Sequence, residues 1–446
     1  MTINLTDLEF LISEQVSSVT DREQLLIYSK ILSKLKNQWV STVDAVADLP
    51  DATGVEGEIY YVIDTNTVYY SNGTEWISLK EAAGGGSLYL WGNAYDLTVG
   101  FIGDETPVPY FWAEFDDWTQ FDLSKFGCHE MGIRSDGTLW AWGDGSNGKL
   151  GNNSYSYSQS PVSVVGGFTD WCQVSAGPQH TAAVRANGTL WTWGRESYGR
   201  LGNNEGGSYT AKSSPVSVVG GFTDWCQVSA GYQHTAAVRE NGTLWTWGLS
   251  SNGQLGDGTI TDQSSPVSVI GGFTDWCQVG AGCKHNAAIR ENGTLWAWGR
   301  NQCGRLGDGT ITDQSSPVSV IGGFTDWCQV SAGSYNTAAI RENGTLWTWG
   351  AVYAGRLGNN NNNTNKSSPV SVVGGFTDWC QVSIGEATSV ALRTDGTAWM
   401  WGGNSDFQIR AAYSNFSSPV SVLGNHLDWI SVAISNNVVS GLRAEN

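Results

Sequence analysis

The chain has 446 residues, of which 57 are Gly and 23 are Trp, and its formal net charge is −19. Lys and Arg are not clustered, and no apolar run is long enough to span a membrane. Because nucleic acids bind through clustered cations and a membrane span needs a long apolar run, we expect no nucleic-acid partner and no membrane insertion.

Residues 1–39 contain two capping boxes that predict helix starts, from Thr6 to Glu9 and from Thr20 to Glu23. No basic stretch leads into an apolar one here, so we expect no signal peptide. Apolar residues then recur at a three-four spacing, at Leu25, Tyr28, Leu32 and Leu35. Two short helices bury little surface alone, so we predict an attachment segment that makes the protein a homo-oligomer.

Residues 40–81 predict a small β connector. Its strands are expected at 58–63, 67–70 and 75–79, separated by Thr65-Asn66 and Asn72-Gly73. Residues 49–79 resemble short modules in tail fibres and other virion proteins of tailed bacteriophages, which share a Tyr pair and Asn-Gly-Thr-x-Trp. Residues 82–86 are Gly-rich and predict a flexible hinge.

Residues 87–446 repeat one pattern seven times. Trp-Gly steps begin at Trp91, Trp142, Trp193, Trp247, Trp298, Trp349 and Trp401. Asp-Trp steps begin at Asp117, Asp170, Asp224, Asp275, Asp326, Asp378 and Asp428, and Pro-Val steps recur as often. Three independent markers therefore agree on seven units.

Each unit predicts four short strands, for example those in SPVSVVGG, WCQVSAG, HTAAVR and TLWTWG. The last two are joined by Asn-Gly, which favours a hairpin with a type I′ turn. Four strands repeated seven times without intervening helices predict an all-β, seven-bladed β-propeller.

The two ends of this region are expected to share one blade. Residues 438–446 match the strand that elsewhere precedes the hairpin, but the chain stops before the next strand. Residues 86–92 match the missing strand and have no hairpin partner before them. Joining the two restores a seventh copy and closes the ring without a large unpaired edge.

The stretch from 234 to 258, HTAAVRENGTLWTWGLSSNGQLGDG, resembles the repeat of the regulator of chromosome condensation family. The resemblance covers residues 84–446 and is renewed in all seven units. It implies a seven-bladed propeller with the same sharing of its ends. It does not imply one function, because the family includes exchange factors, inhibitors and ubiquitin-ligase modules.

Repeated polar residues predict no catalytic set, no metal site and no cofactor, because each stands once per blade instead of converging. This applies to the Asp of each Asp-Trp step and to His129, His180, His234 and His285. An Arg precedes most hairpins and is expected to pack on Trp or turn carbonyls. The cysteines of the Asp-Trp-Cys motif are expected to be small buried side chains in a reducing compartment: Cys172, Cys226, Cys277, Cys328 and Cys380.

Loops between the Trp-Gly and Pro-Val steps differ most between units and share one connection, so they should emerge on the same face. They are rich in Asn, Ser and Gly, a composition that with Tyr suits recognition. We predict binding by the tyrosines of these loops: Tyr155, Tyr157, Tyr198, Tyr209, Tyr353 and Tyr413. The alternative is that these loops are insertions that the scaffold tolerates.

An attachment segment, a connector, a hinge and a propeller predict a non-enzymatic structural protein of a phage virion, assembled in the host cytoplasm. It would contact other virion proteins through residues 1–80, and its propeller would contact a host-surface glycan or protein or a neighbouring virion subunit. A second hypothesis is a cellular propeller that regulates or inhibits a protein partner. A third is a glycan-cleaving enzyme that uses loop acids such as Glu105, Glu196 or Glu205.

Overall fold

The structure is a computed structural model, and it describes residues 41–43, 59–62, 67–71, 76–78, 86–92, 106–111, 117–124, 129–206, 210–404, 409, 414–424, 426–435 and 438–444. The predicted helices within residues 1–39 and most of the predicted hinge, residues 82–85, lie outside this part of the chain. Within it, no helix is long and apolar enough to cross a membrane.

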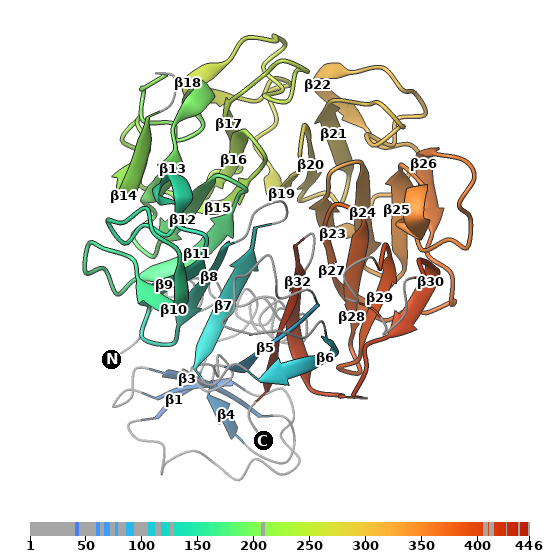
Figure 1. The fold of residues 1–446 in the computed structure, drawn as a ribbon, viewed down its shortest axis with the longest axis horizontal. Coiled ribbons are helices and arrows are strands. Elements are labelled where there is room, and N and C mark those ends of the chain that lie inside the picture. Colours follow the sequence, from blue (N-terminus) through green and yellow to red (C-terminus); the bar gives the residue numbers. More distant parts are fainter. Residues whose placement is uncertain are drawn as a thin grey trace.

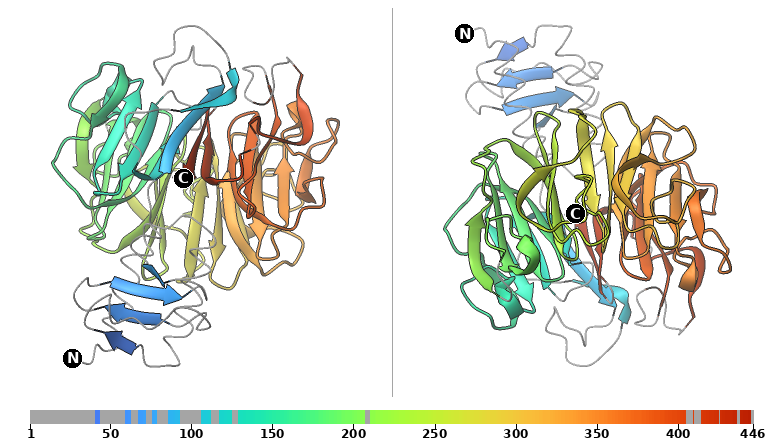
Figure 2. Two further views of the ribbon diagram at one scale, coloured as in Figure 1. Left: turned by 90° about the horizontal axis from the view of Figure 1, so that it is seen from below. Right: turned by 90° about the horizontal axis from the view of Figure 1, so that it is seen from above.

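Four short strands form a sheet separate from the propeller (Figure 2). In order they are β1 (Ser41–Val43), β2 (Ile59–Val62), β3 (Thr67–Ser71) and β4 (Trp76–Ser78). The last three lie where the connector strands were expected, and β1 adds an unexpected parallel pairing with β2. The division of the chain after residues 39, 81 and 86 remains a prediction.

All other strands form seven antiparallel blades around a central axis (Figure 1). Five blades are separate four-stranded sheets, and one eight-stranded sheet contains the other two. These two are linked where Gly86 pairs with Trp118. In each blade the strand that starts at the Asp-Trp step is innermost, and neighbouring innermost strands contact one another around the ring. The predicted all-β, seven-bladed propeller is confirmed.

The blades are numbered here from the first one that is continuous in sequence. Blade 1 contains β7 (Trp118–Leu123), β8 (His129–Arg134), β9 (Leu139–Gly143) and β10 (Ser158–Ser163). Blade 2 contains β11 (Trp171–Ala176), β12 (His180–Arg185), β13 (Leu190–Arg195) and β14 (Ala211–Ser217). Blade 3 contains β15 (Trp225–Ala230), β16 (His234–Arg239), β17 (Leu244–Gly248) and β18 (Gln263–Ser268). Blade 4 contains β19 (Trp276–Ala281), β20 (His285–Arg290), β21 (Leu295–Gly299) and β22 (Gln314–Ser319).

The remaining blades follow the same order, with the Pro-Val strand outermost. Blade 5 contains β23 (Trp327–Ala332), β24 (Asn336–Arg341), β25 (Leu346–Gly350) and β26 (Lys366–Ser371). Blade 6 contains β27 (Trp379–Ile384), β28 (Thr388–Arg393), β29 (Ala398–Gly402) and β30 (Phe416–Ser421). Blade 7 contains β31 (Trp429–Ile434), β32 (Val438–Ala444), β5 (Gly86–Gly92) and β6 (Thr106–Phe111). Short 3-10 turns are η3 (Ser146–Gly148), η4 (Ser197–Gly199) and η5 (Tyr353–Gly355).

Blade 7 is built from both ends of the propeller region. β32 pairs antiparallel with β5, from Val438 opposite Gly92 to Ala444 opposite Gly86. This confirms the predicted sharing of one blade. The sharing goes further than predicted, because the N-terminal side supplies two strands, β5 and β6, where only one was expected.

The Asn-Gly hairpins do not have the predicted type I′ turn. In blade 2 the Gly188 N–H donates to the Arg185 carbonyl (2.8 Å) and the Arg185 N–H donates to the Thr189 carbonyl (3.0 Å). Within this loop only Gly188 has a positive φ, +71°. The loop is therefore a type I turn followed by a left-handed glycine. Asn187 accepts hydrogen bonds from the Thr189 N–H (3.1 Å) and hydroxyl (2.6 Å), which explains why Asn stands here.

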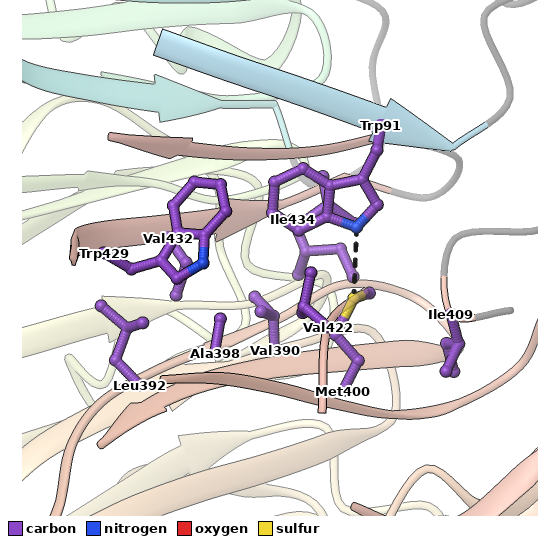
Figure 3. Packing of buried hydrophobic residues seen from close by; sticks show 11 residues of the cluster. Trp91, Val390, Leu392, Ala398, Met400, Ile409, Val422, Trp429, Val432 and Ile434 are labelled. Atoms are coloured by element: carbon purple, nitrogen blue, oxygen red, sulfur yellow. Dashed lines mark hydrogen bonds between the residues drawn. The ribbon is translucent and has the colours of Figure 1, made fainter. Parts of the chain in front are cut away.

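The hydrophobic core is distributed between neighbouring blades. Figure 3 shows the cluster between blades 6 and 7, where Trp91 of β5 and Trp429 of β31 pack against Val390 and Met400. The two indole rings are 5.4 Å apart, and Trp91 Nε1 donates to Met400 Sδ (3.4 Å). β5, the first strand of the propeller, therefore pairs with β32 and also packs against blade 6.

A glutamine on the innermost strand joins neighbouring blades. Gln227 Nε2 donates to the Val279 carbonyl (3.1 Å), and Gln227 Oε1 accepts from the Val279 N–H (2.7 Å). The side chain thus mimics one rung of a β-ladder between two separate sheets. Equivalent bonds reach the next blade from Gln120, Gln173, Gln278, Gln329 and Gln381.

The seam between blades 7 and 1 differs from the other six. Ser431 occupies the glutamine position of blade 7. As at the other seams, an apolar cluster lies between the blades here, and it includes Leu88, Trp118, Phe121 and Leu442. Ring closure therefore rests on β-pairing and apolar burial.

Removing residues 440–446 should open the ring. The deletion leaves β5 without its β32 partner and removes the buried Leu442 side chain. Loss of one buried Leu costs about 2–5 kcal/mol, and with the lost pairing we expect Tm to fall by about 10 °C or more. Thermal unfolding monitored by Trp fluorescence measures this. Deleting only residues 445–446 is the control and should leave Tm unchanged; equal Tm values for all three proteins would refute the closure.

Replacing an interblade glutamine should destabilise the fold more than replacing an exposed one. Gln227→Ala leaves the Val279 N–H and carbonyl without their partner. We expect a loss of about 2 kcal/mol in the free energy of unfolding, measured by urea denaturation. Gln159→Ala, at an exposed position of β10, is the control and should stay within about 0.5 kcal/mol of the parent. A loss no larger for Gln227→Ala than for the control would remove the proposed interblade role.

Candidate functional site

The two ends of each blade form two different faces of the ring. In blade 2 the hairpin between β11 and β12 lies beside the loop that follows β13, because His180 pairs with Gly194 and the Arg195 N–H donates to the Gln179 carbonyl (2.8 Å). We call this side, with its equivalents in other blades, the loop face. The opposite side carries the Asn-Gly hairpins and the Asp-Trp steps, and we call it the turn face.

On the turn face every blade has the same ion pair. Arg185 Nε and Nη2 donate to the two carboxylate oxygens of Asp170 (2.7 and 3.0 Å), and the Arg185 guanidinium lies 3.8 Å from the Phe168 ring centre. The repeated Arg therefore pairs with the Asp of the Asp-Trp step, and the expectation of turn carbonyls as its partners is wrong. The other pairs are Arg134–Asp117, Arg239–Asp224, Arg290–Asp275, Arg341–Asp326, Arg393–Asp378 and Arg443–Asp428.

Buried histidines link neighbouring blades. His180 Nε2 lies 2.9 Å from Thr235 Oγ1, and the Thr235 hydroxyl donates to the Arg200 carbonyl (2.9 Å). Since the hydroxyl proton is used there, His180 donates from Nε2. Desolvation by burial, aided by nearby Arg200, lowers the pKa of His180 well below its usual value. The same link joins His129 to Thr181, His234 to Asn286 and His285 to Thr337.

The Gly-x-Leu-Gly turn of one blade packs against the Trp of the next. Trp247 Nε1 donates to the same Arg200 carbonyl (2.9 Å). A Cβ on Gly202 would lie 2.7 Å from Trp247 Nε1, and a Cβ on Gly231 would lie 2.5 Å from the His234 ring. Both positions therefore require glycine. The repeated His, Trp and Gly residues are explained by the scaffold.

The repeated cysteines do not lie where they were expected. All seven described cysteines are free thiols, but Cys226, Cys277 and Cys328 are exposed, so the prediction that they are buried is wrong. The Cys226 thiol donates to the Val238 carbonyl (3.4 Å). Desolvation by the surrounding protein raises the pKa of Cys226 to about 12, so the accessible side chain stays a poorly reactive thiol.

Acidic side chains of the loops do not form an obvious reaction centre. Glu196 is buried and accepts from Asn203 Nδ2 (3.1 Å), while Glu205 forms an ion pair with Lys212 (2.7 Å). The bond to Glu196 uses Oε2 alone, since Oε1 is buried without a hydrogen-bond partner, and burial raises the pKa of this carboxyl to about 7. Glu105 lies outside the described residues. In the described part of the chain, no group of three or more His, Cys, Asp or Glu could hold a metal ion.

The predicted binding tyrosines that the structure describes are exposed on the loop face. The exposed fractions are 58% for Tyr155, 48% for Tyr157, 45% for Tyr198 and 74% for Tyr353. Tyr198 also has φ of +67°, a left-handed conformation that is strained for an aromatic residue. Their role in binding remains a prediction. The other two candidates, Tyr209 and Tyr413, lie outside the described residues.

A group that the sequence analysis missed also lies on the loop face. Arg305 of blade 4 and Arg356 of blade 5 approach the ring of Tyr335, with guanidinium carbons 5.1 and 5.5 Å from its centre. We call these residues, with neighbouring Arg300, the arginine–tyrosine cluster. The available signal was the Arg in two Gly-Arg-Leu-Gly turns, but nothing in the linear sequence places them beside one tyrosine.

The sequence model of the RCC1-like domain family matches residues 87–439 of this chain. The chain belongs to the RCC1-like domain family. It is similar to the Ultraviolet-B receptor UVR8 of Arabidopsis thaliana, with 34% identity over 237 residues, which is 52% of this chain and 52% of UVR8. It is also similar to the mitochondrial RCC1 domain-containing protein RUG3 of the same organism, with 31% identity over 289 residues, 61% of this chain and 63% of RUG3. The chain therefore spans less than two thirds of the length of either relative.

Solved structures show the same architecture. Prp20p of Saccharomyces cerevisiae superposes with a TM-score of 0.71 and 18% identity, covering 81% of this chain and 92% of Prp20p. At this identity the likeness shows the fold alone.

The relatives of this RCC1-like domain correct the predicted function. We predicted a bacteriophage virion protein, located in the virion and bound to other virion proteins and a host surface. This is wrong, because the relatives are cellular proteins. The prediction rested on residues 49–79, where the resemblance to tail-fibre modules is not supported. A meander of three short strands carries too little information to assign a function, whereas the family match covers residues 87–439.

The buried histidines should make the RCC1-like domain sensitive to acid. Desolvation lowers the pKa of His234 to about 4 in the folded state, against about 6.5 when unfolded. As pH falls through this window the unfolded chain binds the proton first, so stability falls. His234→Asn, which places there the residue type of Asn336 in blade 5, should lose about 2 kcal/mol less between pH 7 and pH 4.5.

Urea unfolding at several pH values measures this difference. His426→Asn is the control. Because His426 is only half-buried on the turn face, this substitution should change the pH dependence of the free energy of unfolding less than His234→Asn does. If the free energy of unfolding depends on pH in the same way for His234→Asn and the parent, the lowered pKa of His234 in the folded state is contradicted.

Proposed function

We propose that this RCC1-like domain is a non-enzymatic module that binds and regulates a protein partner through its loop face. The observation that carries the proposal is the asymmetry between the two faces. The turn face repeats the Arg–Asp pair in every blade and adds a Phe in five of them, whereas the loops of the loop face differ in length or sequence between most blades; those of blades 3 and 4 share the sequence of residues 256–262 and 307–313. Selective recognition needs a surface that is not repeated, and only the loop face offers one.

The exposed tyrosines support binding to a protein. Tyr198 and Tyr353 are held on short 3-10 turns, η4 and η5, that are packed against the next blade's outer strand. A rigid backbone that presents a large amphipathic ring costs little entropy on binding. The surrounding Asn, Ser and Gly residues supply adaptable hydrogen-bonding groups.

Relatives also support a binding role. UVR8 is described as a receptor, and Prp20p as having binding properties toward Gsp1p and histones. A receptor and a binder of other proteins share this architecture, which accords with recognition by loops on a common scaffold.

The absence of enzymatic activity is part of the proposal. In the described chain, the repeated His, Thr, Trp, Arg and Asp side chains form hydrogen bonds within the scaffold, as the contacts of Arg185 and His180 illustrate. A nucleophile–base pair or a metal-activated water needs side chains that converge on an open site. The free polar groups of the loop face are better suited to contacts with another protein.

Replacing exposed loop-face tyrosines should release the partner. We expect Tyr198→Ala/Tyr353→Ala in the full chain to reduce recovery of the native partner at least about fivefold, measured by quantitative mass spectrometry of affinity-purified complexes. The control is Leu427→Ala, which removes a side chain that is 68% exposed beside the Asp-Trp step of the turn face. Equal recovery with the tyrosine variant, or loss with the Leu427 control alone, would overturn the assignment of the loop face.

A further inference from the structure

Building on the proposed loop-face binding, we propose that the arginine–tyrosine cluster is a docking site for an acidic segment of the partner protein, whose carboxylates pair with Arg356 and Arg300. The inference concerns the chemistry of the partner and the residues that select it.

Arginines on the two faces have opposite kinds of partner. On the turn face, carboxylate hydrogen bonds raise the pKa of Arg393 and Arg443 above the usual value. In the cluster, Arg305 donates only to backbone carbonyls, at Gln302 (3.2 Å from Nε) and Ser334. Burial, aided by the like charge of Arg300, lowers the pKa of Arg305. The loop face thus holds positive charge that the described residues do not neutralise by an ion pair.

The Arg356 guanidinium has hydrogen-bond donors that no described residue uses. Its side chain is only 5% exposed, and within the described chain its sole hydrogen bond runs from Nε to the Tyr353 carbonyl (2.9 Å). The two Nη atoms have no partner there, yet they are not sealed from solvent. A guanidinium in this state is preorganised for a bidentate carboxylate, because most of its desolvation cost has already been met by folding.

Neighbouring groups favour an acidic peptide. Tyr335, 40% exposed, has the guanidiniums of both Arg305 and Arg356 near its ring and offers an aromatic contact surface beside them. Half-buried Lys284 and Arg300 add positive charge at the rim, against one exposed acid, Glu386. The excess of cations here is local, because the whole chain carries a formal charge of −19.

The net negative charge of the whole chain favours one kind of anionic partner over another. A nucleic acid extends its phosphates over a long distance and would meet the acidic remainder of the surface, which repels it. A short acidic peptide places a few carboxylates on the cluster and leaves the rest of the surface uncovered. The charge distribution therefore favours a protein segment over a nucleic acid.

The test uses the full chain and a fluorescein-labelled peptide of alternating Glu and Gly, with its Gln-Gly counterpart as the neutral probe. Fluorescence anisotropy across a salt series should show binding of the Glu peptide alone, weakening as salt rises. Arg356→Gln and Arg300→Gln should each raise Kd about fivefold to tenfold. Arg356→Lys keeps the charge but loses the fork, so its Kd should be intermediate. Lys212→Gln, on the outer strand β14 of blade 2, removes one positive charge two blades away from the cluster and should leave Kd unchanged.

Several outcomes would overturn the inference. These are unchanged Kd values for both Arg→Gln variants, equal binding of the Gln peptide, or tighter binding of a single-stranded oligonucleotide of equal charge. Sedimentation of the full chain as a dimer that Arg356→Gln dissociates would assign the cluster to a second copy instead. Arg300→Gln keeps the test valid if Arg356→Gln fails to fold, because Arg300 lies at the half-buried rim.

The outcome is separable from that of the proposed function. If the tyrosine double variant loses the native partner while Arg356→Gln retains it, loop-face binding stands and the acidic-segment inference falls. If the Glu peptide binds in an Arg356-dependent manner but the tyrosine variant retains the partner, the cluster stands and the role of Tyr198 and Tyr353 falls.

Discussion

The propeller depends on hydrogen bonds that pass from each blade to the next. A four-stranded sheet leaves the outer backbone groups of its edge strands unpaired and cannot bury its two broad faces, so each blade needs neighbours. Gln227 extends a β-ladder across the gap to Val279, and the Arg200 carbonyl receives both Thr235 and Trp247 from the following blade. Because these bonds repeat around a closed ring, one short pattern of Trp, Gly, Gln and His specifies the whole domain.

This constraint divides the surface into a fixed and a variable part. Turn-face arginines such as Arg185 are neutralised by Asp170 and stacked on Phe168, so they stabilise the scaffold and have no capacity left for a ligand. On the loop face, the Arg356 side chain is held by one hydrogen bond to the Tyr353 carbonyl, and Arg305 donates to the carbonyls of Gln302 and Ser334. The same residue type is thus structural on one face and available for recognition on the other, and the difference is whether a carboxylate stands within reach.

The repeat made the architecture predictable, because Trp91 and its six equivalents mark every blade and residues 438–444 needed a partner strand. The turn type was not predictable, since Asn-Gly fits two hairpin loops and only the pairing of Arg185 with Thr189 distinguishes them. The arginine–tyrosine cluster was missed because Arg305, Tyr335 and Arg356 belong to successive turns and hairpins and meet only across a blade boundary. Variation between units marks loops that the scaffold does not constrain, so the exposure of Tyr198 and Tyr353 could be expected from the sequence, while their role in binding is still a prediction.

Because blade 7 combines strands from both ends of the propeller region, its strands are synthesised at widely separated times. β5 and β6 are synthesised before any other blade strand, yet β32, which pairs with the other edge of β5, is the last of the blade strands in the chain. Until β32 leaves the ribosome, the nascent chain presents an open strand edge and the apolar side chains of Leu88 and Leu90, the kind of surface that recruits holding chaperones. Pairing of β5 with β32 can therefore close the ring only after all the intervening blade strands have been synthesised.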